Sequence, residues 1–207
     1  MTGNQYLLNS ARFGTHHLVA NLLKGKINIL DIGCNDGYLR KLYPRGKFTG
    51  IEYSATAAKM AKKNGYQSVR VGDLNNYQQF RITQKFQALV FADVLEHLID
   101  PEKVLSYFIK QNLSRRGFVI VSLPNVAHLT IRLGLLFGNF NYTDSGILDR
   151  THFHLYTTQT AHILLQNAGL KIISSHFSSN RFGFLFKSFP ILGPLLGFNL
   201  IYLCQKA

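Results

Sequence analysis

The sequence is poor in cysteine and shows no sign of export. Only two cysteines occur in 207 residues, Cys34 and Cys204, so no disulfide framework is available. The N-terminus lacks the basic start and apolar block of a signal peptide, and we therefore expect a cytoplasmic protein. There is no internal repeat or low-complexity tract. With 46% apolar and 16% charged residues, positions 1–207 are expected to form one globular domain.

Acidic residues are also scarce. Ten Asp and Glu stand against 23 Lys and Arg, which gives a formal net charge of +13. Six of the ten acids belong to the motifs described below, so most of the remaining surface is cationic. Such a surface attracts nucleic acid, anionic lipid or acidic glycan. Because the chain contains no compact run of Lys and Arg, solubility alone is an equally good explanation.

Two common phosphate-binding fingerprints are missing, yet a glycine loop is present. Residues 27–32 form an apolar run suited to a buried strand, and Gly33 and Gly37 follow it. The glycines allow a sharp turn and a close approach to a ligand. Neither G-x-G-x-x-G nor G-K-[ST] occurs, and the Asp31 carboxylate would repel a pyrophosphate. The loop therefore favours a cationic ligand, although an ordinary tight turn is the alternative.

Three further predicted strands also end in an acid. Glu52 closes the run 47–52, at the spacing where nucleotide-binding α/β units place a carboxylate that binds ribose hydroxyls. Asp73 follows the run 68–71, and Asp93 follows 86–92. In a parallel sheet all four strand ends meet at one edge, where such sheets bind ligands. This edge is the predicted binding site.

Strands and helices alternate along the chain, which predicts an α/β fold with a doubly wound, mostly parallel sheet. We expect seven strands, at 27–32, 47–52, 68–71, 86–92, 117–122, 170–176 and 199–205. Helices are expected at 15–24, 37–43, 54–63, 75–80, 101–112 and 157–167.

Across about positions 15 to 206 these motifs resemble class I S-adenosylmethionine-dependent methyltransferases. Asp31–Gly37 matches the family's motif I, with Asn35 where the family often has glycine, and Phe91–His97 matches motif IV. The resemblance implies a Rossmann-like, seven-stranded sheet with an antiparallel last strand, and S-adenosylmethionine as cofactor. The implied cofactor-binding residues are Asp31, Gly33, Cys34, Gly37, Glu52, Tyr53, Asp73, Leu74, Ala92 and Asp93.

Residues 123–157 form a connection of a length typical of a functional insertion, and we interpret them as a substrate lid. The segment is rich in His, Asn, Asp, Arg and Tyr, which bind and deprotonate polar substrates. Its Gly146–His152 stretch is similar to the corresponding region of bacterial methyltransferases of polysaccharide and surface-glycan biosynthesis. That narrower resemblance implies a sugar or glycan acceptor.

Methyl transfer to a hydroxyl needs alignment, exclusion of water and removal of one proton. Histidine is the natural base near neutral pH. We predict His152 as the catalytic base with His97 second, although His152 could instead be a structural residue of the lid. His128 and His154 lie in the same segment, whereas His16 and His17 of the first helix are interpreted as structural.

No metal ligand is assigned outright, but one set of side chains allows an alternative. Asp93, Glu96 and His97 share a face of the turn after the fourth strand, and His152 could join them. The set resembles the metal site of RNA 3′-end 2′-O-methyltransferases, and some quinone-biosynthetic O-methyltransferases have a comparable Glu-His pair. Mg²⁺ or Mn²⁺ held there would lower the pKa of an acceptor hydroxyl.

Residues 182–197 are apolar, but prolines and glycines interrupt them, which argues against a spanning helix. We interpret them as a flap over the acceptor site or a contact with a membrane surface. A buried hairpin arm or a dimer contact is the alternative.

The sequence therefore predicts a cytoplasmic S-adenosylmethionine-dependent methyltransferase, with membrane association as the alternative location. O-methylation of a small-molecule, sugar or lipid-linked glycan hydroxyl is the first interpretation. A metal-assisted RNA 3′-end methyltransferase is the second, so nucleic acid is a less favoured partner. A non-catalytic, cofactor-binding partner subunit is the third.

Overall fold

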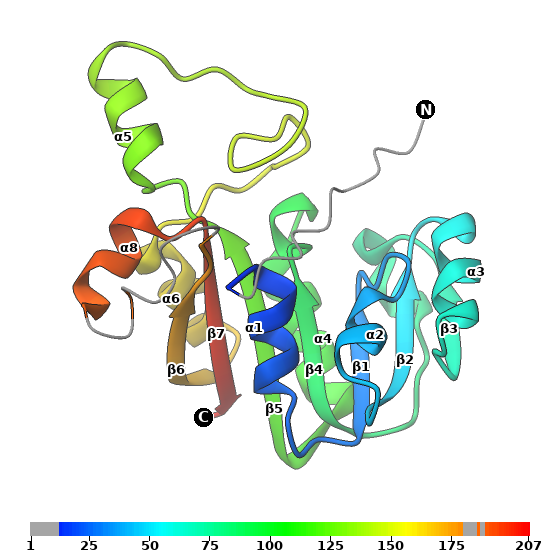
Figure 1. Ribbon diagram of the computed structural model, residues 1–207. Helices are drawn as coiled ribbons and strands as arrows, with labels where there is room; N and C mark the ends of the chain where they lie inside the picture. Colours follow the sequence, from blue (N-terminus) through cyan, green and yellow to red (C-terminus); the bar gives the residue numbers. More distant parts are fainter. Residues whose placement is uncertain (1–12, 180–185, 187–188) are drawn as a thin grey trace.

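The computed structural model describes residues 13–179, 186 and 189–207 and contains one seven-stranded sheet (Figure 1). The strand order is β3-β2-β1-β4-β5-β7-β6. β7 runs in the direction opposite to the other six strands and pairs antiparallel with β5 and β6, which confirms the predicted fold class. The strands are β1 (Asn28–Ile32), β2 (Lys47–Glu52), β3 (Ser68–Val71), β4 (Phe86–Ala92), β5 (Leu113–Pro124), β6 (Leu170–Phe177) and β7 (Asn199–Lys206).

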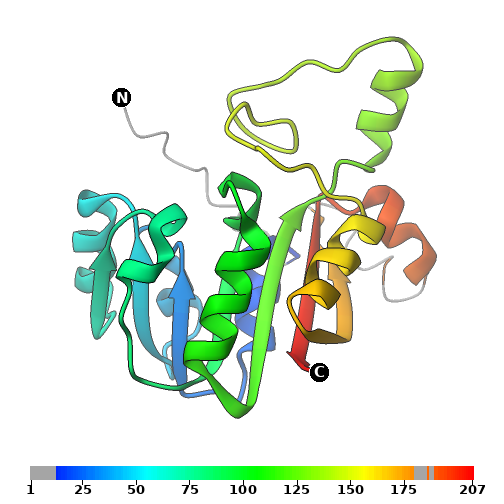
Figure 2. The same cartoon turned by 180° about the vertical axis from the view of Figure 1, so that it is seen from behind.

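Helices connect these strands and cover both faces of the sheet (Figures 1 and 2). The α-helices are α1 (Thr15–Leu22), α2 (Tyr38–Leu42), α3 (Ala55–Lys63), α4 (Pro101–Asn112), α5 (Leu129–Leu136), α6 (Thr158–Asn167) and α8 (Gly193–Leu196). The 3₁₀ segments are η1 (Leu74–Gln79), η2 (Leu95–His97) and η3 (Pro190–Leu192). Among the described residues, no helix is long and apolar enough to cross a membrane.

Two hydrophobic cores sandwich the sheet because alternate strand residues point to opposite faces. In β4, Leu89 and Phe91 pack with α4 and α6, whereas Ala88 and Val90 pack with α1, α2 and α3. Both faces of the central strands are thus buried, which explains why these strands are continuous apolar runs in the sequence.

Local sequence signals define where several helices begin. The Ser54 side chain accepts a hydrogen bond from the Ala57 amide and caps α3. At the start of α4, Asp100 caps the helix and Pro101 occupies its first turn, where a missing N–H costs nothing. Thr157 and Thr160 form a reciprocal capping box on α6. These caps fix the loops at the strand ends, where the site lies.

The segment predicted as a substrate lid contains a helix, α5, that was not predicted from the sequence. α5 has no buried residue and stands away from the sheet, on the same side as α8 (Figures 1 and 2). Because no residue of α5 is buried, the apolar spacing of a core-facing helix is weak there.

The predicted flap at 182–197 lies partly outside the described residues. In the described part, Gly193 packs against the Phe177 ring of β6. The Asn125 side chain donates hydrogen bonds to the carbonyls of Pro194, at 2.9 Å, and Gly197, at 2.8 Å. This part therefore anchors the start of β7.

Gly50 of β2 provides a test of the packing beneath the glycine loop. A Cβ built at this position would lie 2.5 Å from Cys34 Sγ and 3.1 Å from Tyr66. We expect Gly50→Ala to lower the free energy of unfolding by about 1–3 kcal/mol in a urea titration. The double variant Gly50→Ala/Cys34→Ala should recover part of this loss because it removes the sulfur. Equal stability of Gly50→Ala and the parent would contradict the packing.

Candidate functional site

The glycine loop after β1 folds as the sequence predicts. Gly33 and Gly37 have φ values of 78° and 82°, and Asn35 also lies in the left-handed region, at 46°. A Cβ on Gly33 would lie 2.7 Å from Val94 Cγ2, so this approach requires glycine. The loop is tied to β2 because the Asn35 amide donates to Glu52 Oε2 at 2.8 Å.

The Glu52 carboxylate lies at the carboxyl end of β2 beside this loop. Its Oε1 accepts a hydrogen bond from the Ser54 amide at 2.9 Å, so both oxygens are oriented by backbone N–H groups. Next to it, Tyr53 is 76% exposed and can meet a ligand only from the solvent side.

Asp31 is buried at the end of β1, with 2% of its surface exposed. Tyr66 donates its hydroxyl proton to Asp31 Oδ2 at 2.5 Å. Burial raises the pKa of Asp31 to about 7 despite this hydrogen bond. Folding therefore disfavours the ionised form of this carboxyl group, and a nearby cation would stabilise that form.

Asp93 directly follows β4 in a strained conformation, with φ of 53°. Its Oδ1 accepts hydrogen bonds from Ser122 Oγ at 2.6 Å and Asn199 Nδ2 at 2.8 Å. Side chains from β5 and β7 thus orient this carboxylate. Sequence reasoning did not identify Ser122 or Asn199, because only the sheet brings them to Asp93.

The acid after β3 has a local role as well. Asp73 caps η1, where its Oδ1 accepts from the Asn75 amide at 2.9 Å. Its neighbour Leu74 is buried in the core that contains α4.

A cavity opens at this edge of the sheet, between the glycine loop and the end of β4. Of the predicted residues, Asp31, Gly33, Cys34, Ala92 and Asp93 line it, whereas Glu52, Tyr53, Asp73, Leu74 and the glycine at 37 do not. Additional lining comes from His16, Asn35, Asp36, Tyr38 and Leu39. The interpretation of His16 as structural is therefore incomplete: α1 folds back against the loop and places this side chain in the cavity.

The environment of His16 is mainly acidic. Burial lowers the pKa of this histidine, while Asp93 and Asp36 oppose that effect. Three carboxyl groups, those of Asp31, Asp36 and Asp93, line the cavity. Such a lining suits a ligand that carries positive charge.

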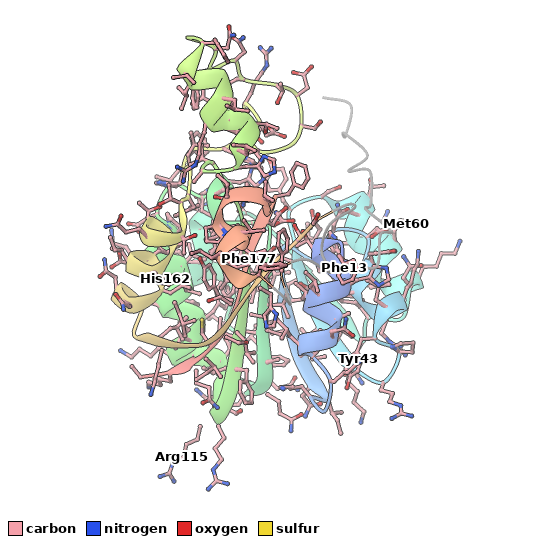
Figure 3. The ribbon with its side chains drawn as sticks, turned by 60° about the vertical axis from the view of Figure 1, so that its left-hand side comes forward. Phe13, Tyr43, Met60, Arg115, His162 and Phe177 are labelled. Carbon is pink, nitrogen blue, oxygen red and sulfur yellow. The ribbon has the colours of Figure 1, made fainter. Side chains whose placement is uncertain are left out.

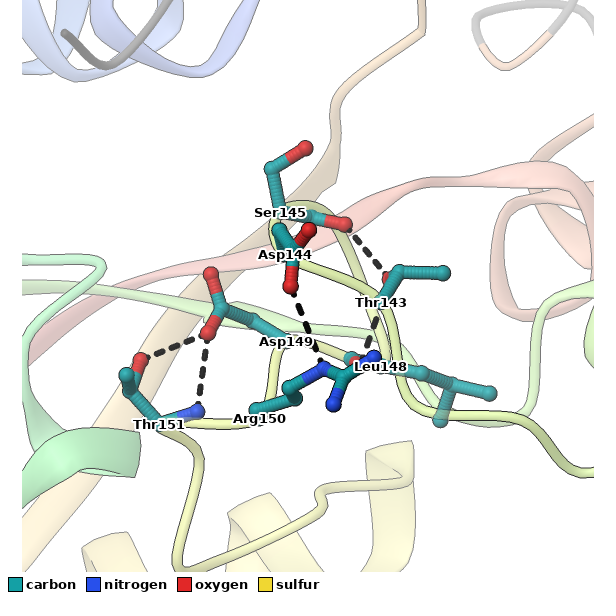
Figure 4. Close-up of polar contacts among 7 residues, drawn as sticks. All are labelled: Thr143, Asp144, Ser145, Leu148, Asp149, Arg150 and Thr151. Atoms are coloured by element: carbon teal, nitrogen blue, oxygen red, sulfur yellow. Dashed lines mark hydrogen bonds and ion pairs between the residues drawn. The ribbon is translucent and has the colours of Figure 1, made fainter. Parts of the chain in front are cut away.

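The lid returns to the body through a tight turn (Figure 4). Thr143 Oγ1 donates to the Ser145 carbonyl at 2.8 Å, and Arg150 pairs with Asp144 at 3.1 Å. Asp149 Oδ1 accepts from the Thr151 amide, at 2.8 Å, and from its hydroxyl, at 2.7 Å (Figure 4). These contacts fix the backbone that carries His152.

The turn places the two predicted catalytic histidines together. The rings of His97 and His152 are 4.7 Å apart, centroid to centroid, and meet edge to face. His152 Nδ1 lies 3.1 Å from the Ile147 carbonyl, and His97 Nδ1 lies 3.2 Å from the Thr151 carbonyl. Because a carbonyl only accepts, Nδ1 of each ring carries a proton, and the Thr151 hydroxyl lies 3.0 Å from His97 Nδ1 as well.

Glu96 lies beneath this pair and is 1% exposed. Neither carboxylate oxygen has a hydrogen-bond partner among the described residues. Burial raises the pKa of Glu96 well above its usual range, and Asp93 and Asp149 add to the effect. Ligand atoms of Glu96, His97 and His152 lie within 4.8 Å of one another, so this Glu-His-His cluster can hold a cation.

Asp93 was predicted as a fourth ligand of the same set, but it does not belong to the cluster. Its carboxylate is held instead by Ser122 and Asn199. The other lid histidines have separate roles: His128 caps α5 and stacks on Phe198, while His154 Nε2 contacts the Ile99 carbonyl at 3.3 Å.

The raised pKa of Asp31 predicts a stability change. Because its folded-state pKa is about 7, above the ordinary value of 3.8, folding disfavours the ionised form. Stability is thus lost as pH rises from about 4 through about 7. We expect Asp31→Asn to raise the free energy of unfolding at pH 8 by about 1–3 kcal/mol, with no gain near pH 4.

Urea titrations across this pH range measure the effect. Asp36→Asn, at a half-buried carboxyl on the same loop, is the matched control and should show no comparable gain. An unchanged stability of Asp31→Asn at pH 8 would contradict the assignment of a buried, destabilising carboxylate.

Curated relatives match part of this chain. It is 30% identical over 58% of its length to the ubiquinone biosynthesis O-methyltransferase of Glaesserella parasuis serovar 5 (strain SH0165), covering 54% of that protein. The protein of the same name from Haemophilus ducreyi (strain 35000HP / ATCC 700724) is 33% identical over 48% of this chain and 46% of its own. The chain thus spans about half the length of these relatives.

Solved structures share the fold at low identity. A magnesium protoporphyrin IX methyltransferase from Synechocystis PCC 6803 with bound SAH superposes with a TM-score of 0.65 at 17% identity, over 93% of this chain and 82% of that one. A possible histamine N-methyltransferase from Thermotoga maritima gives 0.66 at 17%, over 95% and 90%. A family model described as a methyltransferase domain matches residues 9–175, and the chain therefore belongs to the methyltransferase-domain family.

Proposed function

We propose that this chain is an S-adenosylmethionine-dependent O-methyltransferase that acts on a hydroxyl group of a small acceptor molecule. The observation that carries the proposal is one juxtaposition. Asp93 is one of three carboxyl groups that line the cavity, and it is close enough to the Glu-His-His cluster to raise the pKa of Glu96. A cation-binding pocket and two neighbouring histidines thus meet at the end of β4.

The cavity fits a sulfonium cofactor. S-adenosylmethionine, when bound, supplies an electrophilic methyl group on a positively charged sulfur. Asp31, Asp36 and Asp93 provide the negative lining, and Glu52 can accept from two ribose hydroxyls. The predicted contacts of Asp73, Leu74 and Tyr53 with the purine belong to the same proposal.

His152 is the proposed base. Burial and the neighbouring His97 lower its pKa, so the imidazole is neutral at pH 7. Its Nδ1 proton is held by the Ile147 carbonyl, which leaves Nε2 to take the acceptor's hydroxyl proton. His152 Nε2 would take this proton while the acceptor oxygen is aligned with the methyl group that the bound cofactor would supply.

The lowered pKa of His152 bears on the acceptor class. A weak base deprotonates an acidic hydroxyl, such as a phenol with a pKa of about 10, more readily than a sugar hydroxyl. The names of the curated relatives, ubiquinone biosynthesis O-methyltransferases, agree with methyl transfer to an oxygen. The sugar or lipid-linked glycan acceptor expected from residues 146–152 would need further activation of its hydroxyl.

The Glu-His-His cluster offers that activation. Glu96, His97 and His152 fit a divalent cation because a buried carboxylate without a partner is costly until it binds a proton or a metal. Mg²⁺ or Mn²⁺ held by these side chains would lower the pKa of a coordinated acceptor hydroxyl. His152 would then be a metal ligand instead of the base that takes the acceptor's hydroxyl proton.

Binding and turnover test the main proposal. We expect calorimetric titration of the purified chain to show binding of S-adenosylmethionine, and release of S-adenosylhomocysteine to depend on an added acceptor. The acceptor panel should contain catechols and other phenols, activated sugars, glycolipids and short RNAs. Absence of any cofactor binding would disprove the methyltransferase assignment. Binding without turnover on every acceptor would favour a non-catalytic partner subunit.

His152→Ala should separate chemistry from cofactor binding. We expect turnover to fall about 10²–10⁴-fold because proton transfer loses its base, while the calorimetric affinity for S-adenosylmethionine changes little. His176→Ala on β6 is the matched control and should retain activity. A His152→Ala enzyme with normal turnover would exclude this residue as the base.

The metal proposal has a readout that does not depend on activity. Mn²⁺ should raise the melting temperature of the parent chain, and Glu96→Gln should abolish this rise because the amide is a poor metal ligand. Glu96→Gln without metal should be at least as stable as the parent, since it removes a buried carboxyl. If Mn²⁺ does not change the melting temperature and turnover is full in EDTA, the metal proposal is rejected and His152 remains the proposed base.

A further inference from the structure

Acidic and basic side chains are distributed unevenly between the two ends of the parallel strands. All ten acidic side chains lie among the described residues. They lie at or shortly after the carboxyl ends of β1 to β4, at the start of α4, or in the lid. The opposite edge, where the parallel strands begin, thus contains no carboxylate side chain.

That opposite edge is rich in exposed cations. Lys47 is the first residue of β2, Lys85 precedes β4, and Lys171 is the second residue of β6. Arg115 lies early in β5, and Lys206 ends the antiparallel β7, which therefore returns to the same edge. Figure 3 shows Arg115 pointing away from the body at the end opposite the lid.

The cations also extend across the thickness of the molecule. Lys63 ends α3 on one face of the sheet, and Lys110 lies in the last turn of α4 on the other face. Lys24, in the loop before β1, is exposed as well. Seven strands at a spacing of about 4.8 Å give the edge a length of about 29 Å. The basic edge, defined by these cations, therefore extends both along the row of strands and across the two faces of the sheet.

The basic edge lacks the features that recognise nucleic acid. Among the described residues, the exposed aromatic side chains are Tyr53, Phe137, Tyr142, Phe153, Phe189 and Phe198, all in the lid or at the opposite edge. Stacking platforms for single-stranded bases are thus missing. The loops of the basic edge are short connections between strands and helices, with no element that could enter a duplex groove.

We propose that the basic edge docks on an anionic phospholipid surface. A plane of lipid phosphates matches a broad surface of positively charged side chains. The attraction grows with each Lys or Arg that reaches the lipid surface. Docking in this way turns the cofactor edge and the lid away from the bilayer, so the acceptor is met from the aqueous side. The described residues 189–197, part of the segment expected to contact a membrane, lie on the other side of the molecule, near the lid (Figure 1).

Vesicle flotation with the full chain tests the proposal. The probes are vesicles of phosphatidylcholine alone and of phosphatidylcholine mixed with phosphatidylglycerol. We expect binding only to the mixed vesicles, with loss at high salt. The triple variant Lys47→Gln/Arg115→Gln/Lys171→Gln should bind at least about tenfold more weakly. The matched triple Lys59→Gln/Arg70→Gln/Lys103→Gln, which removes the same charge elsewhere, should lose about twofold at most.

Melting temperatures close to that of the parent establish that both triple variants are folded. Equal losses in the two variants would mean that net charge alone drives binding and would overturn the proposal. So would loss of binding in Leu136→Ser/Phe137→Ser, which would assign docking to the lid edge. Tighter binding to a short RNA than to the mixed vesicles, lost in the first triple variant, would identify the partner as nucleic acid instead. Failure of vesicle binding would leave the methyltransferase proposal untouched.

Discussion

The parallel pairing of β1 with both β2 and β4 is the constraint on which the site depends. Because the chain reverses its direction of winding between β1 and β4, the loops after these strands diverge to opposite faces. The divergence opens the cavity, and parallel alignment brings the strand-end acids to its rim. The helix caps and the turn of the lid then position side chains around this opening.

Several residues of the site have conformations or environments that destabilise the folded protein. Asp31 and Glu96 are buried carboxyl groups, and burial disfavours the ionised form of both. Asn35 and Asp93 add left-handed backbone where L side chains are strained. The two flanking cores offset these costs. A cationic ligand or metal would relieve the buried charge, so ligand affinity and apo stability oppose each other here.

How far the sequence predicts the structure depends on the range of the interaction. Strands such as 86–92 are evident from their apolar runs, and capped helices such as α4 from their Asp-Pro start. α5 was missed because none of its residues is buried and no apolar periodicity is imposed on it. His16 was interpreted as structural because its place in the cavity comes from the docking of α1 against the glycine loop.

The sequence by itself determined the class of fold, the glycine loop and the acids at the strand ends, because periodicity and backbone conformation are local properties. Only the tertiary structure decided which side chains meet. His97, Glu96 and His152 converge because a turn more than fifty positions away in the chain packs on η2, while Asp93 is withdrawn from them by Ser122 and Asn199. The basic edge likewise exists only once the strands align. Convergence of distant residues depends on packing, and packing is a property of the whole chain.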